Sequence, residues 1–261
     1  MQEIGKVFLA LLLAHLLGDF PFQPSRLLAQ KARHWWAHGL HGSIHFALLI
    51  FALLIFVPLL PVFTGRLLLA AVAYVAVHVV IDLSKQQLVR RGLVQDSANV
   101  FLTDQTLHLA SMVVLAAFIT RIDWPAIQSL MALRSSTKDA ILSGGVVYTI
   151  VVFAGGYLIR HMTRGLLGGV SSQLGESVEQ LTNAGLYIGW LERLLIVTAV
   201  VLRSPTLIGL ILTAKSIARF PEMKESKFAE YFLIGTLLSV IMALFGGLVL
   251  LKAWFGAVSL Q

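Results

Sequence analysis

The sequence predicts an all-α membrane protein, a bundle of about seven to eight transmembrane helices with one amphipathic interfacial helix. Three numbers support this prediction: 57% of the 261 residues are hydrophobic, only 13% are charged, and the mean hydropathy is +0.84. Soluble domains carry roughly 25% charged residues, so most of this surface faces something other than water. The apolar residues also form long runs between short polar stretches, as expected for helices that cross about 30 Å of hydrocarbon.

Eight apolar segments are candidate spans. They are residues 4–23, 41–60, 66–88, 98–120, 139–160, 185–203, 205–219 and 228–254. The segment that follows Pro205 is short, which indicates a tilted or re-entrant helix. Gly155–Gly156 and Gly246–Gly247 lie within spans, where small residues let helices pack closely. Between the fifth and sixth spans, apolar residues recur at helical spacing from Leu166 to Leu181, which predicts an amphipathic helix on the membrane surface, or a lid.

Residues 1–261 are interpreted as a single transmembrane domain with three parts. Residues 1–120 form a four-span half, residues 121–184 hold loops, the fifth span and the interfacial helix, and residues 185–261 hold the carboxyl-terminal spans. The first apolar run is not followed by a small-residue cleavage site, so we expect it to remain as a span.

The distribution of basic residues predicts the orientation. Twelve of the 20 Lys and Arg residues flank the odd-numbered loops and seven lie on the opposite side, near the even-numbered loops and the two termini. This bias places the odd-numbered loops in the cytoplasm and both termini outside. Basic loops account for the net charge of +7, so no nucleic-acid partner is expected. The chain has no cysteine, which excludes thiolate metal ligands.

Four consecutive spans each carry two metal-ligating side chains four residues apart. The pairs are His15/Asp19, His41/His45, His78/Asp82 and Asp104/His108. Residues i and i+4 lie on one face of a helix. The pairs end the first and third spans and begin the second and fourth. Because successive spans run antiparallel, all four pairs fall at the same membrane depth, on the predicted cytoplasmic side.

These eight residues are the candidate metal ligands. Mixed histidine and carboxylate ligands suit a divalent metal, zinc first, with manganese or iron as alternatives. Eight ligands exceed the need of one zinc ion, so either two metals bind or some residues orient the others. A single His/Asp pair in a membrane bundle can also be a simple hydrogen bond between helices. The candidate catalytic residues are Asp82, Lys85 and Asp104. The candidate substrate-binding residues are Lys31, Lys215 and Arg219, whose cations suit a phosphate or a lipid headgroup.

The same motifs resemble a known family. The stretch from His15 through Gly18-Asp19 to Gln23, then His78-x-x-Ile-Asp82-x-x-Lys85 and Asp104-Gln105-x-x-His108, is similar to a bacterial integral-membrane family of unknown function, DUF3307. This resemblance implies a multi-pass protein of the bacterial inner membrane and no established activity. The paired His and Asp residues are more loosely similar to bacterial membrane-bound metal-dependent hydrolases.

Three functions are consistent with the sequence. The first is a metal-dependent hydrolase that acts on a lipid or phosphorylated membrane substrate at the cytoplasmic leaflet. The second is an ion- or proton-coupled transporter that uses the His/Asp cluster as a relay. The third is a structural or partner-binding membrane protein in which the pairs hold helices together. The lipid bilayer is the expected surrounding partner, and the oligomeric state is left open.

Overall fold

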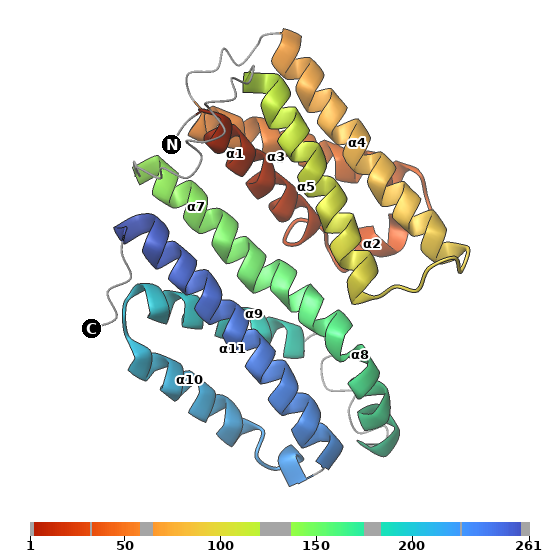
Figure 1. Cartoon of the computed structure of the whole chain (residues 1–261). Coiled ribbons are helices and arrows are strands. Elements are labelled where there is room, and N and C mark those ends of the chain that lie inside the picture. The colour runs from red at the N-terminus through yellow and green to blue at the C-terminus, as the bar shows by residue number, and fades with distance from the viewer. Residues whose placement is uncertain are drawn as a thin grey trace. The chain divides into compact units, whose positions relative to one another are not determined.

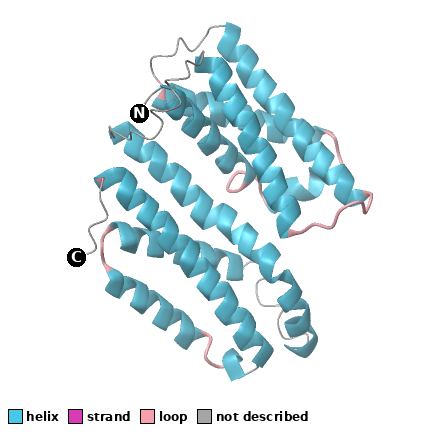
Figure 2. Cartoon of the chain, in the orientation of Figure 1, coloured by secondary structure: helices cyan, strands magenta, loops and turns pink. Residues whose placement is uncertain are grey.

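The computed structural model describes residues 3–31, 33–57, 65–120, 137–174, 184–224 and 226–256. Within these ranges every regular element is a helix and none is a strand (Figure 2). The all-α prediction is therefore confirmed. The chain forms two compact units, residues 1–146 and residues 147–261.

The described residues of the first unit form five helices and the start of a sixth (Figure 1). They are α1 (Glu3–Asp19), α2 (Ser25–Lys31), α3 (Trp36–Phe56), α4 (Gly65–Arg90), α5 (Ala98–Thr120) and the first turns of α7 (Thr137–Thr149). Helix α1 packs against α3 and α5, and α4 packs against the same two helices. The side chains of Val7, Ala10 and Leu11 from α1 and Leu49 from α3 are fully buried between them. This apolar core fixes the four helices that carry the candidate ligands.

Two predicted boundaries in this unit are wrong. The first span was expected to reach residue 23, but α1 ends at Asp19. Phe20 precedes Pro21, and a residue before proline disfavours the helical conformation. The short helix α2 then follows Pro24. The second span begins at Trp36, five residues earlier than the expected residue 41, because its polar first turns are also helical.

The second unit contains the end of α7, a π-helical turn η2 (Ile150–Ala154), α8 (Gly155–Leu174), α9 (Ala184–Val201), α10 (Pro205–Ala218), the 3-10 turn η4 (Glu222–Lys224) and α11 (Ser226–Phe255). Helix α11 packs against α9 and α8, and α10 packs against α9. A Cβ atom added to Gly247 would lie 2.6 Å from Cβ of Val200. One added to Gly155 would lie 2.6 Å from Cε of Met242. The expected close packing at both glycine pairs is therefore present.

The π-turn η2 interrupts an otherwise continuous helix. The amide of Gly155 donates to the carbonyl oxygen of Ile150, five residues earlier instead of four. The carbonyl oxygen of Val152 accepts two hydrogen bonds from the guanidinium of Arg193, at 3.2 Å from Nε and 2.9 Å from Nη2. A side chain from α9 therefore satisfies a carbonyl group within the widened turn.

The interfacial helix expected from Leu166 to Leu181 does not begin as a separate helix. As far as Leu174 this segment is the end of α8, which continues the fifth predicted span without a break. The remainder of the predicted helix, up to Leu181, lies outside the described residues.

Among the described residues, five helices are long and apolar enough to cross a membrane. They are Trp36–Phe56, Leu67–Arg90, Ala98–Thr120, Thr137–Arg164 and Ser226–Phe255. Several large apolar side chains on them are exposed, including Phe51 (63%), Val114 (70%) and Phe245 (70%), which suggests contact with lipid. The structure is thus compatible with a multi-pass membrane protein. The predicted count of seven to eight spans is not confirmed, because α10 has only 14 residues and α1 only 17.

Candidate metal centre

The four pairs of candidate ligands lie together inside the first unit. Helices α1, α3, α4 and α5 each contribute one pair. The histidine side chains are at most 1% exposed; they are His15, His41, His45, His78 and His108. The three carboxylates are also largely buried, with side-chain exposures of 10% for Asp19, 16% for Asp82 and 5% for Asp104. Spacing of four residues puts both members of each pair on the inner face of their helix.

Four of these side chains meet at one point. Oδ1 of Asp19 lies 3.1 Å from Nε2 of His41, 3.1 Å from Nε2 of His45 and 3.4 Å from Nε2 of His78. Nε2 of His41 is also 3.1 Å from Nε2 of both His45 and His78. In a tetrahedral zinc site with bonds of about 2.0–2.1 Å, the ligand atoms are about 3.3 Å apart. Five of the six edges of such a tetrahedron therefore have suitable lengths.

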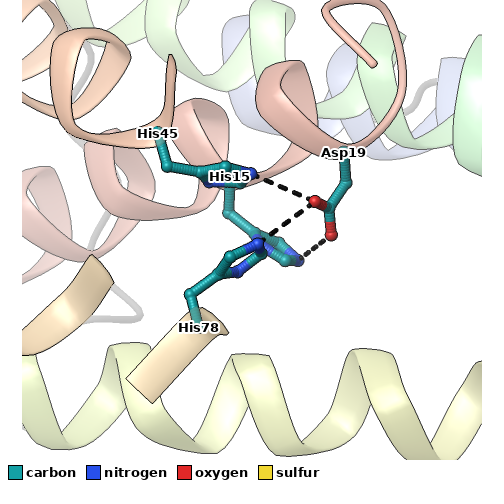
Figure 3. A group of neighbouring side chains, drawn as sticks. All are labelled: His15, Asp19, His45 and His78. Atoms are coloured by element: carbon teal, nitrogen blue, oxygen red, sulfur yellow. Dashed lines mark hydrogen bonds and ion pairs between the residues drawn. The ribbon is translucent and has the colours of Figure 1, made fainter. Parts of the chain in front are cut away.

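Figure 3 shows Asp19 with three of its histidine neighbours, His15, His45 and His78. Its carboxylate faces His15, His45 and His78, with one oxygen shared by His45 and His78 and the other 3.6 Å from Nε2 of His15. Nε2 of His15 also lies 3.4 Å from Oε1 of Gln105. The His15 ring is tilted at 39° to the ring of His108, with ring centroids 4.7 Å apart. His15 thus connects the tetrahedral group to the residues of α5.

A second group is formed by Asp82, Asp104 and His108. Nε2 of His108 is 3.6 Å from Oδ1 of Asp82 and 3.8 Å from Oδ1 of Asp104. Among the described residues, neither Nε2 of His108 nor Oδ1 of Asp104 has a hydrogen-bond partner, although both atoms are buried. Oδ2 of Asp82 is 3.5 Å from Nε2 of His41, so this carboxylate reaches both groups. Buried, unsatisfied ligand atoms that face one another fit a bound cation.

Two lysines neutralise part of the acidic charge. Nζ of Lys31, on α2, lies 2.7 Å from Oδ2 of Asp82, and Nζ of Lys85 lies 3.0 Å from Oδ2 of Asp104. With neutral imidazoles, the three carboxylates and two ammonium groups leave one net negative charge. Such a cluster favours a divalent cation over an anion. Lys31, expected to bind substrate, is instead 6% exposed and contacts a candidate ligand.

Two further residues shape this centre, although neither was a candidate site residue. Oη of Tyr74 lies 3.2 Å from Nδ1 of His45, the ring nitrogen that points away from the tetrahedral group. Tyr74 stands four residues before His78, so the same spacing rule identifies it. Gly18 is the other residue, since a Cβ atom there would lie 2.5 Å from Nε2 of His45. No pattern in the sequence marks that requirement.

Another buried histidine and the two other predicted substrate-binding residues lie elsewhere. His38 is buried, and its Nε2 lies 3.2 Å from the carbonyl oxygen of Lys31, where it joins α3 to α2. Lys215 and Arg219 belong to the second unit. Lys215 forms an ion pair with Glu192, and Nη1 of Arg219 lies 3.3 Å from Oε1 of Glu222.

The structure thus defines an all-helical protein with apolar helices long enough to span a membrane and a buried histidine–carboxylate cluster in its first unit. Residues 7–135 match a family described as "Protein of unknown function (DUF3307)", and this part of the chain is a domain of that family. All eight candidate ligands, from His15 to His108, fall within the matched residues. No curated protein and no solved structure matches the chain.

Proposed function

We propose that this protein is a metal-dependent membrane hydrolase that acts on a lipid or phosphorylated membrane substrate at the cytoplasmic leaflet. The observation that carries the proposal is the convergence of ligand atoms from Asp19, His41, His45 and His78, with five of their six separations between 3.1 and 3.4 Å. The neighbouring group of Asp82, Asp104 and His108 provides for a second metal ion, with Asp82 between the two. Zinc suits this mixture of ligands best, and manganese or iron is the alternative.

When bound, such a metal polarises a phosphoryl oxygen and lowers the pKa of a coordinated water. The protein groups around it have distinct roles. Oδ2 of Asp104 is held by Nζ of Lys85 at 3.0 Å and by Nε2 of Gln105 at 3.1 Å. When the first group alone holds a metal ion, Oδ1 of Asp104 is not a ligand and can accept a proton from an attacking water. Tyr74 orients His45 through its second ring nitrogen, as residues behind metal ligands commonly do.

Exposure indicates where a substrate enters. Lys85 has the most exposed side chain of the cluster at 31%, followed by Asp82 at 16%. The histidines are closed to solvent, so the accessible side of the centre is the one bounded by these two residues. Lys85 uses one of its three N–H donors on Asp104, which leaves donors for a phosphate oxygen.

We also propose that α1 and α9 cross the bilayer, in addition to the five long apolar helices. Helix α1 rises about 26 Å over its 17 residues and supplies two candidate ligands to the shared centre. Helix α9 has 18 residues and buries Glu192 and Arg193 against its neighbours. The bacterial inner membrane is the proposed location, on the resemblance of the motifs to a bacterial integral-membrane family.

The test combines metal analysis with an activity assay on detergent-purified full-length protein. Three preparations are compared by inductively coupled plasma mass spectrometry: wild type, His78→Ala/Asp82→Ala and the control His161→Ala. His161 is bonded to the carbonyl oxygen of Tyr157 in its own helix. We expect one or two equivalents of zinc, manganese or iron in wild type and the control, and loss of metal from the folded double variant. Phosphate release from phosphatidic acid or a polyprenyl phosphate should follow the metal content.

Two results would oppose this proposal. If wild type holds no metal after incubation with each of the three ions, the hydrolase is excluded, and a proton relay or a structural hydrogen-bond network remains. If metal binds but no phosphorylated lipid is hydrolysed with any of the three metals, the metal centre stands and the proposed reaction does not.

A further inference from the structure

The second unit contains a cavity of about 450 Å³. None of the residues that line it belongs to the His/Asp cluster. It is bounded by α8, the first half of α9, the last turns of α10 and the first half of α11. Four cationic side chains line it: Arg160, Arg193, Lys215 and Arg219. One carboxylate, Glu192, lines it with them.

The positive charge in this cavity is not balanced by the described residues. Glu192 pairs with Lys215, and Glu222 pairs with Arg219. Arg160 and Arg193 have no carboxylate within ion-pair distance in the described part of the chain, so two positive charges remain. Arg193 is only 3% exposed, and its donors go to the neutral acceptors Val152 and Ser239. A buried cation without an anion is costly, which indicates that an anion belongs beside it.

A second observation points to the same kind of ligand. Oγ1 of Thr236 is buried and has no hydrogen-bond partner among the described residues, and Thr236 lines the cavity. A hydroxyl group can donate to a phosphate oxygen. Phe228 and Phe232 form an apolar wall of the same cavity. Cations, a hydroxyl donor and an aromatic wall together fit an anionic headgroup attached to an acyl or prenyl chain.

We propose that this cavity binds a phosphate monoester. A monoester carries a charge of about −1.5 to −2 near neutral pH, which matches the two unbalanced positive charges better than the single charge of a diester does. Arginine and lysine together supply directional and point-charge contacts to its oxygens. The ester can come from a membrane amphiphile, whose chain lies along the aromatic wall, or the site can accept free inorganic phosphate. The inference does not depend on hydrolysis at the metal centre.

Substitutions at Glu192 and Arg160 should change the affinity for phosphate in opposite directions. The Glu192 carboxylate holds Lys215 and competes with the ligand for that cation. Replacing it by the near-isosteric glutamine removes the competing charge, so Glu192→Gln should bind phosphate more tightly. Arg160→Gln removes an exposed cation of the cavity and should bind more weakly, by about tenfold or more. Lys227→Gln makes the same change of charge at an exposed residue of α11 that does not line the cavity.

The experiment is isothermal titration calorimetry on the full-length protein in a non-ionic detergent. The titrants are dihexanoyl phosphatidic acid, inorganic phosphate and, as a zwitterionic diester, dihexanoyl phosphatidylcholine. We expect the phosphatidic acid to bind wild type and Lys227→Gln equally, Arg160→Gln more weakly and Glu192→Gln more tightly, with no binding of phosphatidylcholine. Comparable affinity for inorganic phosphate would identify the phosphate group alone as the ligand, whereas binding of the lipid alone would identify a membrane amphiphile.

Two outcomes overturn the proposal. One is absence of binding of both phosphate titrants to wild type. The other is an equal loss in Lys227→Gln and Arg160→Gln with no gain in Glu192→Gln, which would show that general surface charge attracts the anion. The variant His78→Ala/Asp82→Ala should bind like wild type, so a failure of the hydrolase proposal is distinguishable from a failure of this one.

Discussion

Substitution of Gly18 by alanine should disable the proposed metal centre without replacing any candidate ligand. The added Cβ atom would lie 2.5 Å from both Cε1 and Nε2 of His45 and 2.9 Å from its Cδ2. Ordinary carbon contacts begin near 3.4 Å, so the ring must move by about 1 Å. Metal–ligand distances are held to within about 0.2 Å, and the required shift is several times larger.

Nε2 of the displaced His45 ring would no longer lie 3.1 Å from Oδ1 of Asp19 and 3.1 Å from Nε2 of His41. Even perturbing residues behind the ligands costs about 10- to 100-fold in metal affinity, and moving a ligand should cost at least as much. Overpacking should also lower the free energy of unfolding by about 1–3 kcal/mol. The assay is competition for zinc with a chromophoric chelator, with thermal unfolding in detergent measured on the same samples.

Two control variants separate the effects of crowding and ligand displacement. Gly42→Ala, on α3, would crowd Cγ1 of Val75 at 2.9 Å, so it should lose stability but keep most of its zinc affinity. In Gly39→Ala no atom lies within 4 Å of the added carbon, so this variant should keep both its stability and its zinc affinity. If Gly18→Ala is folded and its Kd for zinc is within twofold of wild type, the steric reasoning is refuted.

Three further predictions concern side chains behind the ligands and in the second unit. Tyr74→Phe removes the hydroxyl 3.2 Å from Nδ1 of His45 and should weaken zinc binding by about 10- to 100-fold in the chelator competition. Lys31→Met removes the partner of Asp82, so without metal it should cost about 3–5 kcal/mol in a denaturant titration, and saturating zinc should recover part of that loss. Arg193→Met leaves the carbonyl of Val152 without its side-chain donors and should lower the melting temperature, while the zinc content stays that of wild type.

Each of these has a result that contradicts it. Equal zinc affinity in Tyr74→Phe and wild type would mean that the hydroxyl does not orient the imidazole. An identical loss of stability in Lys31→Met with and without zinc would show that Lys31 and the metal do not balance the same carboxylate. Loss of zinc from Arg193→Met would show that Arg193 also supports the metal centre in the first unit.

The convergence of the ligand pairs follows from simple helical geometry. Residues four apart share a face, and antiparallel neighbours bring the end of one helix beside the start of the next. His15, His41, His78 and His108 could therefore be assigned to one membrane depth before any coordinates were known. The structure makes their rings neighbours, with centroid separations of 5.1 Å for His41 and His78, 4.3 Å for His78 and His108, and 4.7 Å for His15 and His108. Helix period alone is enough to predict this part of the site.

Contacts between distant segments were not predictable in the same way. Lys31 pairs with Asp82 across 51 residues, and Lys215 pairs with Glu192 across 23. Both depend on the rotation of one helix about its axis relative to another, which side-chain packing decides and local sequence does not. Gly18 is similar, since its small size matters only because the ring of His45 approaches it from α3.

The π-turn at Ile150–Ala154 changes how the long helix around it must be aligned with other sequences. One additional residue in a turn advances every later side chain by about 100° around the axis. Deleting one residue there would restore a uniform α-helix, yet it would turn Gly155 away from Met242 and Gly156 away from Nη2 of Arg193, where an added Cβ would now lie 2.6 Å and 2.5 Å away. The apolar stripe of this helix therefore changes direction around the helix axis at the π-turn. A gap of one residue at this point in an aligned homologous sequence indicates that the following helix is rotated about its axis, and not merely that the helix is shorter.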